Sequence, residues 1–175
     1  DFIWDEFCDW YVETAKYRIY HKEEEKAAAD CVLWVLKTVL KQALKLLHPF
    51  MPFITEEIYS VLVPEEESLM MSEWPQFHAE WDFPAEENVM EHVKEITRGI
   101  RNMRAEMNVP NNRKTKVYVV CEDTEICDGI STLENSIKPL MMAEKILVQQ
   151  TKENIADNAV SVVVPDAVVY LPLED

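Results

Sequence analysis

The chain has 175 residues, of which 48% are hydrophobic and 29% are charged. This balance is typical of a soluble globular protein and excludes disorder along most of the chain. The longest run without a charged residue, Leu46 to Thr55, contains two prolines and is shorter than the roughly 20 apolar residues of a membrane-spanning helix. Phosphate-binding loops need several glycines, so a sequence with only Gly99 and Gly129 holds neither a dinucleotide-binding nor a Walker loop.

The net charge of −16 is unevenly distributed along the chain. Residues 94–116 hold seven basic and two acidic side chains, and four of the five arginines lie there. Lys and Arg neutralise phosphates, whereas an acidic surface repels polyanions. An acidic chain with one basic segment therefore predicts a selective contact with RNA rather than a general attraction to nucleic acid.

Hydrophobic residues recur at helical spacing through the first part of the chain and predict four helices. Pro49 ends the second helix and Pro52 begins the third, because proline is tolerated in the first turn of a helix but not in its interior. A connector with three prolines and four large aromatic residues follows the third helix. The predicted helices cover residues 2–21, 23–48, 52–63 and 86–108.

The last third of the chain contains short β-branched segments that predict strands at residues 117–121, 146–150, 159–164 and 167–171. Ser131 and Glu134 have the spacing of a capping box and predict a helix from about residue 132 to 143. Pro165-Asp166 predicts a tight turn. The expected fold class is α+β. We expect a helical bundle with its aromatic connector over residues 1–86, then a long basic helix and a small mixed α/β unit over residues 87–175.

One face of the predicted 86–108 helix is basic, and it lies apart from the apolar seam of the same helix on a helical wheel. A solvated charged face has the same pattern, and that interpretation stays open. Arginine dominates over lysine here, and its planar guanidinium binds phosphate through two hydrogen bonds and stacks on bases. The candidate RNA-binding residues of this helix and the loop after it are Lys94, Arg98, Arg101, Arg104, Asn108, Arg113 and Lys114.

The first predicted helix is rich in aromatic residues, with Trp4, Phe7, Trp10 and Tyr11 inside eight positions. Most of these rings should be buried in the core. One helix cannot bury all of them, and an exposed ring can stack on an unpaired base. Trp10 and Tyr11 are therefore candidates for contact with RNA, with burial in the core as the open alternative.

No catalytic or metal site is predicted. The cysteines contain no Cys-x-x-Cys pair, and the four histidines do not cluster with them. The sequence has no secretory signal, so reduced thiols and a cytoplasmic location are expected. Paired glutamates such as Glu56 and Glu57 are typical of a solvated surface, and no nucleophile, base and orienting group can be named together.

Three segments together resemble the C-terminal part of the valyl-tRNA synthetase family. The second of them is shared by the class I synthetases for valine, isoleucine and leucine, whereas the first and third point to valine. Shorter matches at residues 67–71, 74–75 and 169–173 add to the likeness. The three segments are Trp4-Asp5-Glu6-Phe7-Cys8-Asp9-Trp10-Tyr11, Leu47-His48-Pro49-Phe50-Met51-Pro52-Phe53-Ile54-Thr55-Glu56-Glu57 and Ile100-Arg101-Asn102-Met103-Arg104-Ala105-Glu106-Met107-Asn108-Val109-Pro110.

The resemblance implies the anticodon-binding region of an enzyme that joins valine to tRNA(Val) with ATP and Mg²⁺. The His-Ile-Gly-His and Lys-Met-Ser-Lys-Ser signatures are absent, so this segment is expected to be non-catalytic and to hold no cofactor. The expected partners are tRNA(Val) and the catalytic and editing domains of the same parent chain, with no membrane. The family's first anticodon-domain helix and its coiled-coil arm would lie outside the segment.

The same resemblance would place Trp10, Tyr11 and Val12 nearest the unpaired anticodon bases, while the basic helix holds phosphates. The alternative is a docking module without direct RNA contact, in which the arginines pair with acidic side chains.

Overall fold

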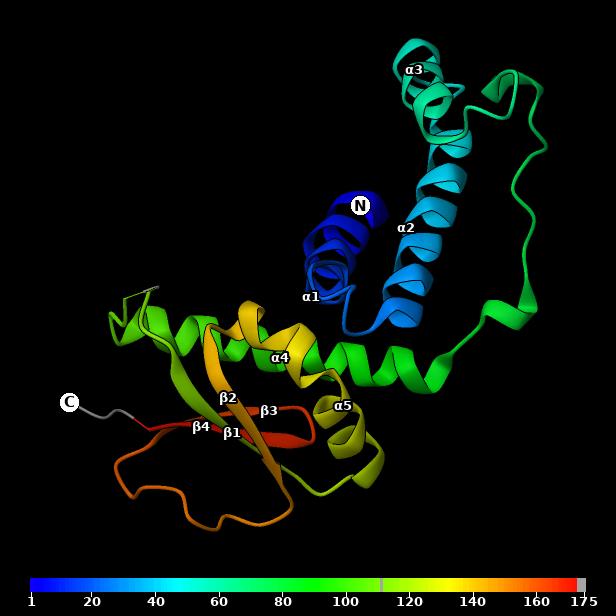
Figure 1. Ribbon diagram of the computed structural model, residues 1–175. Coiled ribbons are helices and arrows are strands. Elements are labelled where there is room, and N and C mark those ends of the chain that lie inside the picture. The colour runs from blue at the N-terminus through cyan, green and yellow to red at the C-terminus, as the bar shows by residue number, and fades with distance from the viewer. Residues whose placement is uncertain (111, 173–175) are drawn as a thin grey trace. The chain divides into compact units, whose positions relative to one another are not determined.

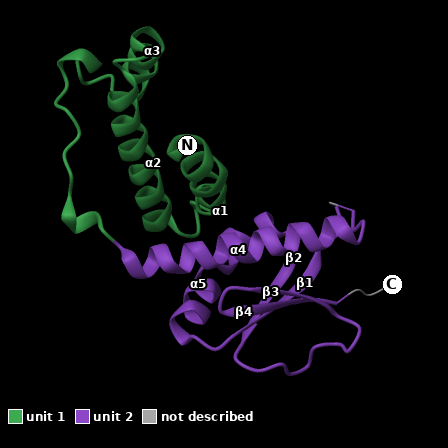
Figure 2. Ribbon diagram, turned by 180° about the vertical axis from the view of Figure 1, so that it is seen from behind, with its two compact units in different colours: residues 1–82 green, residues 83–175 purple. Residues whose placement is uncertain are grey.

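The computed structural model describes residues 1–110 and 112–172, and these form two compact units, residues 1–82 and 83–175 (Figures 1 and 2). The first unit is helical, and the second combines two helices with a four-stranded sheet. The expected α+β class is confirmed. Asn111, in the loop after the basic helix, and Leu173, in the closing match, lie outside the described residues.

The first unit consists of a π-helix, η1 (Phe2–Val12), followed by α1 (Glu13–Tyr20), α2 (Lys26–Leu47) and α3 (Pro52–Leu62). The single helix predicted over residues 2–21 is thus two segments of different winding. Apolar spacing identifies which face of a helix is buried. It does not determine which carbonyl accepts the hydrogen bond of each amide. Helix α2 packs against both α1 and α3.

The corner between α2 and α3 is held by local hydrogen bonds. Pro52 occupies the first turn of α3, as the sequence predicts. Thr55 Oγ1 donates to the Met51 carbonyl at 2.7 Å, and His48 Nδ1 lies 2.8 Å from the same hydroxyl. The Thr55 hydroxyl thus contacts both the last residue before α3 and the imidazole at the end of α2. His48 therefore has a structural role at the end of α2.

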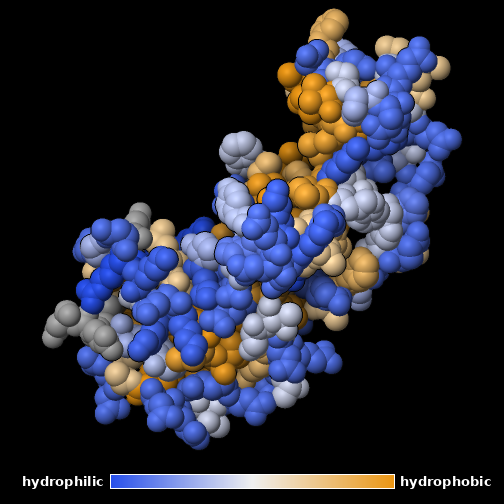
Figure 3. Space-filling view, in the orientation of Figure 1, coloured by the Kyte–Doolittle hydropathy of each residue, from blue (hydrophilic) through white to orange (hydrophobic). Residues whose placement is uncertain are grey.

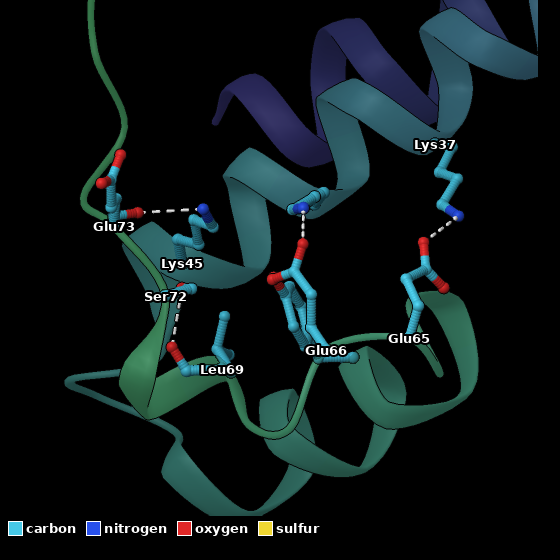
Figure 4. A network of polar contacts seen from close by, with 9 residues as sticks. Lys37, Lys45, Glu65, Glu66, Leu69, Ser72 and Glu73 are labelled. Carbon is cyan, nitrogen blue, oxygen red and sulfur yellow. Dashed lines mark hydrogen bonds and ion pairs between the residues drawn. The ribbon is translucent and has the colours of Figure 1, made fainter.

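A row of lysines on α2 holds the segment that follows α3 (Figure 4). Lys37 pairs with Glu65 at 3.4 Å, Lys41 with Glu66, and Lys45 Nζ donates to the Glu73 carbonyl at 2.9 Å. These lysines are spaced four residues apart, so they lie along one face of α2. They connect α2 to a segment that contains the 3₁₀ turn η2 (Leu69–Met71). A second such turn, η3 (Ala79–Trp81), precedes the second unit.

The second unit begins with α4 (Pro84–Glu106) and continues through β1 (Thr115–Cys121), α5 (Thr124–Met141), β2 (Ala143–Gln149), β3 (Val160–Val164) and β4 (Ala167–Leu171). The strand order in the sheet is β2-β1-β4-β3. β1 pairs in parallel with β2 and antiparallel with β4, and β3 pairs antiparallel with β4. The chain turns between β3 and β4 at Asp166, which has a φ of 57°.

Helix α5 begins eight residues earlier than predicted. Its N-cap is Asp123, whose carboxylate accepts from the Glu125 amide at 2.8 Å and from the Ile126 amide at 3.3 Å. The predicted capping box at Ser131 is therefore wrong: Ser131 lies inside the helix, and Glu134 accepts from the Ile146 amide of β2. An aspartate is as good an N-cap as a serine, so the sequence alone does not separate Asp123 from Ser131.

Helices α4 and α5 cover one face of the sheet (Figure 1). Gly99 of α4 faces Val162 and Val164 of β3, and Gly129 of α5 faces Val89 of α4. The covered face carries Val117, Val119 and Cys121 of β1, which are buried, while the alternating residues Tyr118 and Val120 point to the opposite face. The core of this unit therefore lies between the helices and one side of the sheet.

Candidate nucleic-acid interface

Arg98 is one of the predicted RNA-binding residues on α4 that the structure places on the surface. Its side chain is 52% exposed, and its Nη1 pairs with Glu95 Oε1 at 2.6 Å one turn away. A surface pair of this kind contributes about 0 to 1 kcal/mol, because water screens both charges. The guanidinium therefore stays on the surface, and replacing Glu95 with a phosphate as its partner costs little free energy.

Lys94 and Arg101 lie on the same helix but differ in burial. Lys94 is buried and pairs with Glu91 at 2.6 Å, which corrects the expectation of an outward-facing cation. Arg101 is exposed, and its Nε donates to the Leu140 carbonyl of α5 at 3.3 Å. One side of the Arg101 guanidinium thus helps to join α4 and α5.

Arg104 is not on the exposed face where the sequence places it. It is 4% exposed and donates to Thr115 Oγ1 at 3.2 Å, to the Pro110 carbonyl at 2.9 Å and to the Arg113 carbonyl at 2.6 Å. Burial, and then the nearby Arg113 charge, lower the pKa of Arg104 from its usual value. The helical wheel could not anticipate this, because the chain folds back over the last turn of α4.

The loop after α4 carries the remaining predicted cations. Asn108 is exposed and adopts a left-handed conformation with a φ of 54°, which ends the helix as Asn often does. The Val109 amide then donates to the Arg104 carbonyl at 2.9 Å. Arg113 and Lys114 are exposed and line a pocket at the start of β1. The structure therefore brings these two residues together, with Arg104 beneath the loop.

The aromatic candidates of η1 are less accessible than expected. Trp10 is 8% exposed, which corrects the prediction that it offers a stacking surface. Tyr11 is half-buried and its ring stacks on Phe7 at a centroid distance of 6.1 Å; burial raises its pKa. Val12 is also half-buried. Exposed rings occur elsewhere in this unit, at Trp4, Tyr20, Trp34, Phe50, Phe53, Trp74 and Phe77.

The described residues contain neither a metal-binding cluster nor a membrane-spanning helix. Within residues 1–110 and 112–172, no group of three or more His, Cys, Asp or Glu side chains is placed to hold a metal ion. Among the helices of the same residues, none is long and apolar enough to cross a membrane.

Within the second unit, Arg98 and Arg101 on α4 and Arg113 and Lys114 in the loop before β1 are therefore the exposed candidate cations. A family model described as the anticodon-binding domain of tRNA ligase matches residues 1–119. The chain therefore belongs to this family.

The relatives that the chain resembles are valine–tRNA ligases. The chain is 42% identical over 175 residues to the valine–tRNA ligase of Clostridium perfringens and 40% identical over 178 residues to that of Clostridium tetani. It is 39% identical to the valine–tRNA ligase of Carboxydothermus hydrogenoformans. Each alignment covers 100% of this chain but 19 to 20% of the relative. The chain thus spans about a fifth of the length of these relatives.

Proposed function

We propose that the chain recognises the anticodon stem-loop of tRNA(Val) as part of a valine–tRNA ligase. The observation that carries this proposal is the alignment of the whole chain with valine–tRNA ligases, at 39 to 42% identity for the three relatives above. The family match over residues 1–119 supports anticodon recognition as the task of this segment. The basic segment supplies a physical means of binding RNA in a chain whose net charge is −16.

The exposed arginines of α4 and the loop cations supply the proposed phosphate contacts. Arg98 and Arg101 lie three residues apart on one helix and are exposed, and a guanidinium binds phosphate with two parallel hydrogen bonds. Arg113 and Lys114 extend the positive charge beyond the helix. Buried Lys94 and Arg104 stabilise the unit instead. In the proposal, Tyr11 and Val12 keep their place near the unpaired bases, and Trp10 supports them from the core.

The activity of the parent enzyme belongs to the same proposal. Valine, ATP and Mg²⁺ would bind the catalytic domain, and the present segment would position the tRNA for that domain and for the editing domain. A cytoplasmic location follows from the place of protein synthesis.

A docking module is the second candidate, and the exposed apolar surface of the first unit favours it. Hydrophobic side chains gather at the α3 end of this unit (Figure 3). Phe50, Phe53, Val61, Met70 and Met71 are each more than 70% exposed there. Apolar patches of this kind often mark contacts with other protein surfaces.

A binding titration separates the two candidates. The anticodon stem-loop of tRNA(Val) and a stem-loop with another anticodon are titrated with the chain at several salt concentrations. Tighter binding of the valine stem-loop is expected, with affinity falling as salt rises. Changing Arg98 and Arg101 to Gln together should lower the slope of log K against log salt by about 0.7 to 0.9 for each phosphate that is no longer neutralised.

The matched control is Lys26→Gln, which removes a cation that is 81% exposed on α2 and pairs with Asp30. It should leave the slope unchanged. Equal affinity for both stem-loops, or an unchanged slope in the double arginine variant, would contradict the proposal and leave the docking module as the better account.

A further inference from the structure

The start of β1 lines a pocket of about 430 Å³ within the second unit. Its volume lies in the range of about 300 to 1,000 Å³ that is usual for small-molecule sites. The walls come from four places in the chain: the loop and first residues of β1, the start of β2, the segment between β2 and β3, and the residue that follows β4. The lining residues are Arg113, Lys114, Thr115, Lys116, Tyr118, Glu144, Asn154, Ile155, Ala156 and Pro172.

The chemistry of this lining is that of a site for single-stranded nucleic acid. Arg113, Lys114 and Lys116 are basic residues of one wall, and Tyr118 is half-buried in the same wall. Sites that bind single strands combine a positive groove for the backbone with an aromatic ring on which a base stacks. Asn154 and Glu144 add an amide and a carboxylate, which can hydrogen-bond to the edge of a base.

The sheet supplies the aromatic ring in a fixed position. Tyr118 is paired in register with Tyr170 of β4, so both side chains lie on the sheet face opposite the helices. Lys152 Nζ lies 5.1 Å from the centroid of the Tyr170 ring. The Tyr170 ring already has a cation over it, whereas Tyr118 lines the pocket.

We propose that this pocket takes one nucleotide of an unpaired RNA segment, with its base on the Tyr118 ring and its phosphate against Lys114 and Lys116. This inference rests on the proposed function, since it assigns a second RNA contact to the same chain. The buried Arg104 guanidinium supports the site from below, because it holds the carbonyls of Pro110 and Arg113 on either side of the loop. An acidic peptide would satisfy the cations but has no base to place against the ring.

The test uses the 175-residue chain and a fluorescein-labelled single-stranded RNA heptamer, with anisotropy as the readout. Tyr118→Leu should weaken binding about tenfold, as expected for the loss of one stacked base. Lys116→Gln should lower the log–log salt slope by about 0.7. The matched controls, Tyr20→Leu and Lys26→Gln, change an exposed tyrosine and an exposed lysine of the first unit and should bind like the parent chain.

Cross-linking gives a second readout that does not depend on affinity. A heptamer containing 4-thiouridine should cross-link to peptides that contain residues 113–118 or 154–156. Unchanged binding by Tyr118→Leu, cross-links confined to other segments, or displacement of the heptamer by polyglutamate at equal charge would overturn the proposal.

The two proposals fail in different ways. If stem-loop binding depends on Arg98 and Arg101 while heptamer binding ignores Tyr118, the pocket assignment falls and anticodon recognition stands. If heptamer binding depends on Tyr118 while the chain does not distinguish the two stem-loops, the pocket stands and anticodon recognition falls.

Discussion

Arg104 Nη2 donates to the main-chain carbonyl of Arg113 at 2.6 Å, so one arginine of the basic segment holds the backbone that carries another. One of the arginines predicted to bind RNA is thus part of the support of the loop. Burial of a charge is tolerated here because three acceptors surround it.

Replacing Arg104 with Met should lower the free energy of unfolding by about 2 kcal/mol, because the loop loses its hydrogen bonds to the buried guanidinium. Urea denaturation followed by circular dichroism measures this. Arg98→Met is the control, and it should change stability by less than about 0.5 kcal/mol, since Arg98 is exposed. Equal effects of the two changes would show that Arg104 does not hold the loop.

Glu66 should stabilise the first unit through the contacts it accepts from Lys41 and from the buried Tyr59 hydroxyl. Glu66→Gln should cost about 1 kcal/mol at neutral pH. Glu65→Gln is the control, because Glu65 is 62% exposed and lies 3.4 Å from Lys37. It should have almost no effect.

The destabilisation in the Glu66 variant should also depend on pH. The hydrogen bonds from Lys41 and then Tyr59 lower the pKa of Glu66 below its ordinary value of 4.5. A carboxylate with a lowered pKa contributes its full stability above the unfolded pKa and loses that contribution as the pH falls through the folded pKa. Denaturation at pH 7 and at progressively lower pH should show Glu66→Gln and the parent chain converging. A constant difference would refute the assignment.

The four cysteines should differ in reactivity. Cys31 is exposed and Cys8 half-buried, whereas Cys121 and Cys127 are buried. Burial, and then a side-chain hydrogen bond with Cys121, raise the pKa of Cys127 to about 11. Iodoacetamide at pH 8 should therefore alkylate Cys31 first and leave Cys121 and Cys127 unmodified until the chain is unfolded. Peptide mass spectrometry reads the order, and early labelling of Cys127 would contradict it.

The same thiol predicts a decline in stability at high pH. The pKa of Cys127 is higher in the folded chain than the usual value of 9.0, so its contribution is complete below about pH 9 and is lost between about pH 9 and about pH 11. Cys127→Ala should show a smaller decline than the parent chain across this interval. Parallel stability curves for the two proteins would argue against the shifted pKa.

Gly129 should be replaceable only together with Val89. A Cβ at Gly129 would lie 2.7 Å from both Cγ atoms of Val89, which is too close for packed side chains. Gly129→Ala should therefore destabilise the chain by about 1 kcal/mol, although alanine favours a helix by a similar amount. In a Val89→Ala background the same change should become stabilising. Thermal unfolding of the four proteins tests this reversal, and additive effects would show that the helices do not meet there.

Much of the fold follows from local pattern. Short runs of β-branched residues located β1 and β4, and the three- and four-residue spacing of apolar residues located α4. The early start of α5 was missed, since Asp123 and Ser131 are comparable as caps and only packing against β2 decides between them. The ion pairs of Lys37 and Lys41 could not be predicted, because their carboxylate partners lie 28 and 25 residues away.

The candidate interface was less predictable than the fold. A helical wheel shows that Arg98, Arg101 and Arg104 avoid the apolar seam, but it carries no information on what the following loop covers. The sequence contains one indication of the pocket at β1. Lys116 and Tyr118 occupy the strand positions that alternate with the buried Val117 and Val119. Those alternating positions identify a second sheet face, and its neighbours come from residues 154–156, which no local pattern connects to β1.

Strand β4 lies inside the sheet, between β1 and β3, although it follows both of them in the chain. Until residues 167–171 leave the ribosome, β1 and β3 have no common neighbour, and the hydrophobic sides of α4 and α5 meet an incomplete surface. Assembly of this unit during translation therefore waits for the strand that is synthesised after all the others. A stop codon ahead of β4 would separate β3 from the remaining strands, because β3 pairs with β4 and not with β1.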